Sequence, residues 1–342
     1  MLKFLQFINL NEGGNVTVQY QGKTVSADPI NLETTPRHNV TTGIKHFLSA
    51  LHDHVQKHTG EHLFGKNKVA LEHGTIFGGS TRPMMDSTIT DHEYIHKMGK
   101  KTVGDIDTMV RPEHVSKGGV LEHALQPGSK FGDFTVMGFK HIGTSGHAIV
   151  RNDKTGDHHQ IDFAGVEYEG DHPSKFSQVA YGSPREDMLK GLKGADKTAM
   201  LTAAIKGASG FNGKVVNKKG KVEEEGYLPH RTFSIAKGMR DSHIDLGNGL
   251  AQKITPAKSK TPLRYTTDLE EISKKTFGVP HAEVDSFHGV VRSMKEHFNN
   301  EQIGRTIDIL KKSMEEENNP RMPIAMSVLR DQFGKTHPEY FK

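Results

Sequence analysis

The chain has 342 residues, of which 34% are hydrophobic and 25% charged, and its formal net charge is +4 with 22 histidines counted as neutral. This composition predicts a globular protein with a large polar surface, long enough for two domains. The absence of cysteine excludes disulfides, thiolate metal sites and cysteine nucleophiles. No apolar run approaches the roughly 20 residues of a membrane span, and the N-terminus lacks a secretory pattern. We therefore expect no membrane partner and a cytoplasmic location.

Residues 1–40 are predicted to form a small N-terminal appendage. Within it, NVTVQYQGKTVSADPI alternates apolar and polar side chains around Gly22, which is typical of a hairpin. Thr42 is a good N-cap for a helix that follows. The spacing places one set of apolar residues on a single face of this helix. The set is Ile44, Phe47, Leu48, Leu51 and Val55.

A mixed sheet of four or five strands is predicted next, within a first domain of residues 41–183. VGDIDTMV is a short strand that ends at Arg111-Pro112. FTVMGFKHIG, GHAIVRN and HHQIDFAGVEYE are the later strands, and Asn152 to Gly156 form the turn before the last of them. We expect helices on both sides of this segment, so the fold class is α+β.

The pattern changes at Ser183-Pro184, and residues 184–342 are predicted to form a mostly helical second domain. EDMLKGLKGADKTAMLTAAI has a helical period, GKVVNKKGKVEEEGYLPH is typical of a hairpin, and RTFSIAKGMR of one strand. The C-terminal part has two apolar helical faces and a last helix, MPIAMSVLRDQF. The faces are Val284, Phe287, Val291, Met294 and Phe298, and Ile303, Ile307, Leu310 and Met314.

Asp105 and Asp107 lie two residues apart on the VGDIDTMV strand, so both carboxylates point to one face of the sheet. Adjacent carboxylates repel unless a cation lies between them, and carboxylate oxygens suit Mg²⁺ or Mn²⁺. Asp162 lies on another predicted strand and would complete a metal site if the two strands are neighbours. Taken alone, an Asp-x-Asp pair is more often simply exposed to solvent.

Gly78-Gly79-Ser80 precedes this strand and has the composition of a phosphate-binding turn. Glycine lets backbone N–H groups approach a phosphate closely, and a helix that begins at Ser80 would direct its positive end at a triphosphate. Arg82, inside that helix, would add positive charge. Taken alone, Gly-Gly-Ser is usually an ordinary turn.

The order of these motifs resembles that of the polymerase-beta-like nucleotidyltransferase superfamily, which includes CCA-adding enzymes and poly(A) polymerases. The motifs are Gly78-Gly79-Ser80, then Asp105 and Asp107, then Asp162 beyond a hairpin. The resemblance implies that the serine contacts the triphosphate of an NTP such as ATP and that the three carboxylates bind the metal ions. It also implies a nucleotidyltransferase head as the fold. GKKTVGDID is similar to the loop before the metal strand of poly(A)-polymerase heads.

A further resemblance covers roughly residues 42–240 and concerns nucleotidyltransferases of large tailed bacteriophages; it rests on GFK, QIDF, EDMLKGLKG and TFS. It implies a bacterial host cytoplasm as the location. The segment between Ser80 and Asp105 is longer than in the superfamily, which predicts an insertion. An arginine-rich motif for reading a base, as in CCA-adding enzymes, is absent from the sequence.

Other cationic residues are weaker candidates. Lys190 and Lys193, together with Lys197, would form a basic stripe that contacts phosphates if EDMLKGLKGADK is one helix, or a solvated face. Lys237 and Arg240 are candidates for lining the cleft from the second domain. The lysines between Lys214 and Lys221 could bind a nucleic-acid backbone or form an exposed hairpin tip.

HEYIH, from His92 to His96, matches the zinc protease pattern, with two histidines four residues apart on a helix and Glu93 beside the first. The third histidine of the longer metzincin pattern would fall on Thr102, and Lys97 follows the second histidine directly. We therefore interpret HEYIH as an exposed helix inserted before the metal strand, and keep a zinc metalloprotease as a remote alternative.

The sequence thus predicts an Mg²⁺-dependent nucleotidyltransferase that moves a nucleoside monophosphate from an NTP to a hydroxyl acceptor and releases pyrophosphate. The acceptor could be an RNA 3′ end, a protein side chain or a small molecule. We favour RNA because of the basic charge balance and the poly(A)-polymerase-like head. The alternative is a catalytically silent head that binds nucleotide, RNA or protein.

Overall fold

The computed structural model describes residues 16–143, 145–216, 221–234, 238–247, 250–253 and 265–341. The chain divides into two compact units, Met1–Arg185 (unit 1) and Glu186–Lys342 (unit 2), next to the Ser183-Pro184 boundary that the sequence predicts. Both units contain helices and strands, so the α+β prediction is confirmed.

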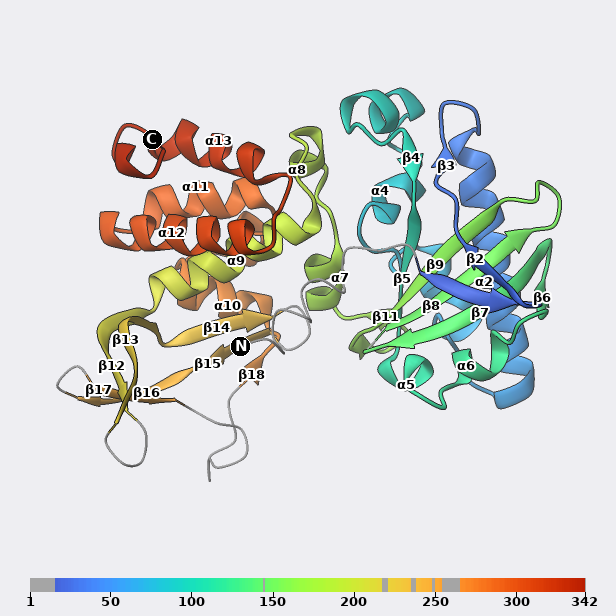
Figure 1. The fold of residues 1–342 in the computed structure, drawn as a ribbon, viewed down its shortest axis with the longest axis horizontal. Helices are drawn as coiled ribbons and strands as arrows, with labels where there is room; N and C mark the ends of the chain where they lie inside the picture. Colours follow the sequence, from blue (N-terminus) through green and yellow to red (C-terminus); the bar gives the residue numbers. More distant parts are fainter. Residues whose placement is uncertain are drawn as a thin grey trace. The chain divides into compact units, whose positions relative to one another are not determined.

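A five-stranded mixed sheet forms the centre of unit 1 (Figure 1). Its strands, in spatial order, are β5 (Asp105–Val110), β9 (His158–Gly165), β8 (Ser145–Asn152), β7 (Phe134–Ile142) and β6 (Lys130–Phe131). β5 and β9 are parallel, and the other neighbours are antiparallel. β8 and β9 are joined by the predicted turn, in which the Asn152 amide donates to the Asp157 carbonyl oxygen over 2.8 Å.

The helices of unit 1 are α2 (Arg37–Thr59), α3 (Val69–Glu72), α4 (Thr81–Met85), α5 (Pro112–Val115), α6 (Val120–Ala124) and α7 (Lys175–Tyr181). The predicted apolar face of α2 is buried, and Phe47 packs edge-on against Phe134 of β7 at 5.6 Å between ring centroids. The predicted start at Thr42 is wrong, because α2 begins at Arg37. Arg37 is buried, and its guanidinium donates to the Pro83 and Met84 carbonyl oxygens, which are distant in sequence. Preferences for cap residues are local, so they do not anticipate a helix start that such contacts stabilise.

The described part of the N-terminal segment packs into unit 1. β1 (Thr17–Tyr20) and β2 (Lys23–Ser26) form the predicted hairpin. Val18 packs against Met137 and Ile149 of the sheet. β3 (Ile30–Asn31) pairs with β4 (Thr102–Val103), and β10 (Tyr168–Glu169) pairs with β11 (His172–Pro173). Residues 1–15 of the predicted appendage lie outside the described residues.

Unit 2 contains two small sheets, whose strands lie along the chain between its earlier and its later helices. The four-stranded sheet has the order β13 (Val222–Pro229), β12 (Gly210–Val216), β17 (Leu250–Lys253) and β16 (His243–Gly247). The three-stranded sheet has the order β14 (Arg231–Ser234), β15 (Gly238–Asp241) and β18 (Tyr265–Thr266). The predicted hairpin is therefore confirmed, whereas RTFSIAKGMR is wrong as one strand, because β14 and β15 pair antiparallel. Residues 217–220 and Lys237 lie outside the described residues.

The helices of unit 2 are α9 (Gly194–Ala208), α10 (Leu269–Thr276), α11 (Phe287–His297), α12 (Asn300–Glu316) and α13 (Met322–Phe333), while α8 (Arg185–Leu189) begins at the division. A helical C-terminal region is thus confirmed, and its predicted apolar faces are buried. The single predicted helix from Glu186 is wrong, because α8 stops before Gly191, whose φ is +81°. Within the described ranges, no helix is long and apolar enough to cross a membrane.

Candidate metal centre

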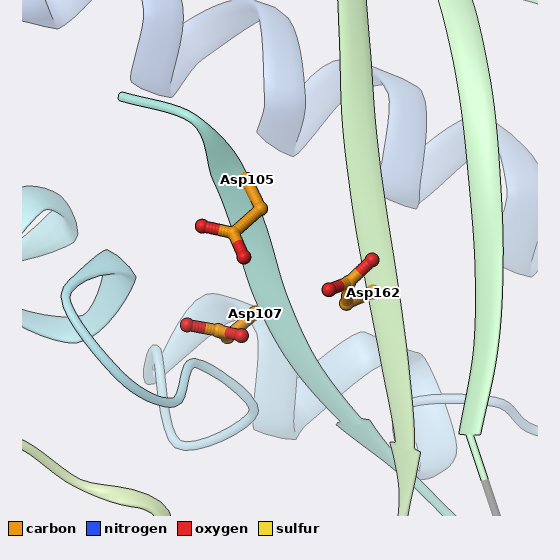
Figure 2. A group of neighbouring side chains, drawn as sticks. All are labelled: Asp105, Asp107 and Asp162. Carbon is orange, nitrogen blue, oxygen red and sulfur yellow. The ribbon is translucent and has the colours of Figure 1, made fainter. Parts of the chain in front are cut away.

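Three aspartates converge on one face of the unit 1 sheet. Asp105 and Asp107 alternate with buried Ile106 along β5, and Asp162 lies on the neighbouring strand β9, directly opposite Asp107. One oxygen from each carboxylate lies within 4.8 Å of the others. Figure 2 shows the three side chains on these two strands, directed into the same space. The convergence that the sequence predicts is therefore present.

Parallel pairing of β5 with β9 sets this register. Each residue from Asp105 to Val110 has a partner between Gln160 and Gly165, without a bulge. The Thr108 hydroxyl also donates to the Asp162 carbonyl oxygen over 2.8 Å. A slip by one residue would turn one strand's carboxylates to the opposite face, so this register is a condition for the cluster.

Two side chains hold the Asp162 carboxylate. His147 Nδ1 lies 2.8 Å from Oδ1, and the Gln160 amide nitrogen lies 2.9 Å from Oδ1 and 3.2 Å from Oδ2. The Val16 amide donates to Gln160 Oε1 over 2.9 Å, which orients the Gln160 side chain so that its NH₂ group faces the carboxylate. The Asp162 side chain is only 13% exposed, so these donors offset part of its desolvation.

The glycine turn, Gly78–Ser80, lies against Asp107. The Gly78 amide donates to the Asp107 carbonyl oxygen over 3.1 Å, and the Gly79 amide donates to the Tyr181 carbonyl oxygen over 2.6 Å. A Cβ atom on Gly79 would lie 2.0 Å from Asp107 Oδ2, and its φ is +46°. Glycine is required at residue 79 both for the backbone conformation and for the close approach of the carboxylate.

The donors of the predicted phosphate site differ from the prediction. The amides of Gly78 and Gly79 already donate to carbonyl oxygens, so they are not the donors directed at a phosphate. The predicted helix is present, with Ser80 as its N-cap and Thr81 as its first residue, but it has only five residues, which gives it a weak dipole. The Thr81 hydroxyl accepts the Asp107 amide over 2.9 Å, which connects this helix to β5. Arg82 donates to the Gln178 carbonyl oxygen of α7 over 3.2 Å.

HEYIH is not an exposed helix, which corrects that interpretation. It lies in a π-helical turn, Glu93–Lys97, whose first three residues are buried. The Glu93 carboxylate is paired with Arg185, with Nε at 2.7 Å from Oε1. His92 and His96 are exposed, with ring centroids 5.1 Å apart. Among the described residues, neither histidine belongs to a group of three metal-binding side chains.

Lys190 and Lys193 belong to unit 2, so they are not among the residues that unit 1 brings together. Lys190 follows the end of α8, and Lys193 precedes α9. Lys197 is on α9 but is 3% exposed. The predicted basic stripe on one helix is therefore wrong, because the chain turns between the first lysine and the second.

Sequence reasoning missed several supporting residues: Arg37, Tyr94, His147 and Gln160. His147 had a detectable signal. In a hairpin, residues that lie equally far from the turn on the two strands are partners, and His147 and Asp162 lie equally far from the turn that follows Asn152. Gln160 lies two residues before Asp162 on one strand and therefore shares its face. Arg37 and Tyr94 act on backbone carbonyls, and such contacts leave no spacing pattern.

The cluster can hold a metal ion. Three carboxylates that lie this close repel one another, and a divalent cation removes that repulsion. Their oxygens are hard ligands of the kind that Mg²⁺ and Mn²⁺ prefer. Within the described part of the chain, these aspartates form the only group of three or more such side chains.

Comparison with known proteins adds no relative. No family model, no curated protein and no solved structure matches the chain. The resemblance to nucleotidyltransferases therefore stays a prediction that rests on the motifs.

Proposed function

We propose that this protein is an Mg²⁺- or Mn²⁺-dependent nucleotidyltransferase that uses an NTP. The observation that carries the proposal is the position of Asp105, Asp107 and Asp162 on adjacent parallel strands, within 4.8 Å of one another. A glycine turn of the expected composition lies directly beside Asp107. A divalent cation bound there would activate an attacking hydroxyl and stabilise the charge of the leaving pyrophosphate.

The reaction is a substitution at the α-phosphorus of the NTP. The acceptor hydroxyl loses its proton to solvent, its oxygen forms a bond to the α-phosphorus, and the bond to the bridging oxygen of the β-phosphate breaks. Pyrophosphate carries away the electron pair of that bond. The three aspartates would hold the cation, and Ser80 would contact the triphosphate with its hydroxyl.

The acceptor that we favour is the 3′ end of an RNA. The net charge of +4 suits a polyanion, and the head resembles that of poly(A) polymerases. Protein side chains and small molecules also carry suitable hydroxyls, so the test must contain each class.

Transfer of label tests this proposal. Bacterial RNA, protein extract and small-molecule extract are incubated with each α-³²P-labelled NTP and Mg²⁺, using wild type and Asp105→Ala/Asp107→Ala. We expect label in the RNA fraction with wild type and a loss of about a thousandfold or more in the variant, because metal catalysis supplies several kcal/mol and each 1.36 kcal/mol is tenfold.

The matched control is Asp133→Ala/Asp157→Ala, which removes the same charge from exposed turns of unit 1. It should transfer label as wild type does. Equal labelling by wild type and the Asp105/Asp107 variant would contradict the proposal. NTP binding without transfer in any fraction would favour the silent head instead.

A further inference from the structure

The insert, residues 86–101, reaches the glycine turn through one buried tyrosine. Tyr94, inside HEYIH, is 1% exposed, and its hydroxyl donates to the Ser80 carbonyl oxygen over 3.0 Å. Ser80 is the residue whose hydroxyl is expected to contact a triphosphate. The insert therefore contacts the backbone of the predicted nucleotide site directly.

A buried cation fixes the other side of Tyr94. The Arg37 guanidinium lies over the Tyr94 ring, 5.6 Å from its centroid, and only 10% of the side chain is exposed. Its hydrogen-bond acceptors belong to α4 and the insert: the carbonyl oxygens of Pro83, Met84, Asp86 and Ile89, and the carboxylate of Asp91. Because one guanidinium binds both segments, α4 and the insert are held together around the Tyr94 ring.

The Tyr94 hydroxyl is a permanent donor. Burial raises its pKa well above the usual value of a tyrosine, and the negative charges of Asp107 and Asp105 raise it further against the opposing charge of Arg37. The phenol is therefore protonated throughout the neutral range.

The contact with Ser80 has a consequence for the next residue. A peptide unit is planar and trans, so its C=O and N–H groups point in opposite directions. The Ser80 carbonyl oxygen accepts the Tyr94 hydroxyl over 3.0 Å and the Met84 amide over 3.4 Å, and these bonds therefore set the direction of the Thr81 N–H. The amides of Gly78 and Gly79 are already bonded, which leaves Ser80 and Thr81 as the residues of this turn that could donate to a phosphate.

We propose that Tyr94 is a positioning residue that orients the Ser80–Thr81 peptide for a triphosphate, so that the insert is a working part of the nucleotide site. The proposal rests on the proposed function, since it assumes that an NTP is bound there. Tyr94 acts through Ser80 and contacts neither the substrate nor the metal ion.

Tyr168 provides a matched control. It is partly buried, its hydroxyl donates to a backbone carbonyl oxygen, that of Met109, over 2.9 Å, and Arg111 lies over its ring at 4.8 Å. The two tyrosines differ in the carbonyl that they hold. Met109 lies beyond the carboxylates on β5, whereas Ser80 belongs to the glycine turn.

The experiment compares Tyr94→Phe with Tyr168→Phe, each of which removes only a hydroxyl. Binding of a non-hydrolysable ATP analogue with Mg²⁺ is measured by calorimetry, Mn²⁺ binding by electron paramagnetic resonance, and folding by thermal melting. We expect similar small losses of melting temperature in both variants. Tyr94→Phe should raise the Kd of the analogue about tenfold, as loss of one buried hydrogen bond implies, and leave Mn²⁺ affinity unchanged. Tyr168→Phe should change neither affinity.

Three results would overturn the inference. Equal analogue affinity in the two variants would show that Tyr94 does not position the turn. Loss of Mn²⁺ binding, or unfolding, in Tyr94→Phe alone would make it a general core residue. If the wild type bound Mn²⁺ but no ATP analogue, both the proposed function and this inference would be wrong. This result differs from the first two because the wild type itself fails to bind the analogue.

Discussion

Both units contain poorly exposed carboxylates, but their surroundings differ. In unit 2, Asp187 and Asp196 are completely buried. Asp196 accepts hydrogen bonds from the Lys193 amide at 2.8 Å, the Asn319 side chain at 3.0 Å and the Arg321 guanidinium at 2.7 Å. Asp187 accepts bonds from both backbone and side chain at the start of α11. Each of these carboxylates lies among donors that hold segments of unit 2 together.

In unit 1, by contrast, three carboxylates face one another. Asp105, Asp107 and Asp162 lie within 4.8 Å, and they remain partly accessible. Concentrated like charge costs folding free energy, which a bound cation would recover. Burial alone therefore does not distinguish a carboxylate that holds segments together from one that could bind a metal ion. Convergence of several aspartates that a sheet holds in register is what sets the unit 1 cluster apart.

The largest effect on the free energy of unfolding should come from replacing one aspartate in each of these two environments. Asp196→Ala removes a completely buried carboxylate that the Arg321 guanidinium contacts at 2.7 Å, and it should lower the free energy of unfolding by about 3–5 kcal/mol. Asp107→Asn should leave the free energy of unfolding unchanged or raise it, because it relieves repulsion, while Mn²⁺ affinity falls at least about tenfold. Urea unfolding and Mn²⁺ titration measure the two quantities.

Exposed Asp331 on α13 supplies the control for Asp196, and Asp331→Ala should be neutral within about 0.5 kcal/mol. If Asp196→Ala were as stable as wild type, or if Asp107→Asn were strongly destabilising, the distinction between the two kinds of carboxylate would fail.

A smaller effect should follow from filling the space between the glycine turn and β5. Gly79→Ala places a Cβ atom 2.0 Å from Asp107 Oδ2, so the carboxylate must move and Mn²⁺ affinity should fall about tenfold or more. Gly74→Ala has a similar positive φ of +69°, but its Cβ would have no neighbour closer than 3.9 Å.

Both glycine variants should lose about 1–2 kcal/mol of stability through backbone strain. Only Gly79→Ala should lose metal affinity in the same Mn²⁺ titration. Equal Mn²⁺ affinities would mean that Asp107 does not need the close approach of the turn.

The smallest effect should be a dependence of stability on pH. His52 is 1% exposed, and burial lowers its pKa from 6.5 to about 4. Between these values the unfolded chain binds a proton that the folded chain excludes, so stability is complete above pH 6.5 and declines as the pH falls toward 4. The loss at pH 5 should be about 1–2 kcal/mol.

Urea unfolding at pH 7 and pH 5 measures this loss. His52→Gln keeps an acceptor for the Phe64 amide, which now donates to Nδ1 over 3.3 Å, and cannot titrate. The variant should therefore show less pH dependence than wild type. Identical pH dependence in the two proteins would exclude His52 as its source.

The sequence by itself determined the local features. Alternation along Asp105–Val110 put two carboxylates on one face, and the turn at Asn152 joined the strands of a hairpin, because both depend on near neighbours in the chain. The helical period likewise predicted the buried faces of α2, α11 and α12. Each of these predictions depends only on residues that lie close together in the chain.

Only the tertiary structure decided which segments meet. The parallel register that brings Asp162 opposite Asp107 joins residues more than 50 positions apart, and no periodicity encodes it. The start of α2 at Arg37 and the burial of Tyr94 depend on hydrogen bonds to backbone carbonyls, which every residue possesses. Such acceptors are not specific to a residue type, so the sequence gives no sign of these contacts. In HEYIH the visible pattern was that of a zinc site, whereas in the structure its central residue, Tyr94, donates to the Ser80 carbonyl oxygen of the glycine turn.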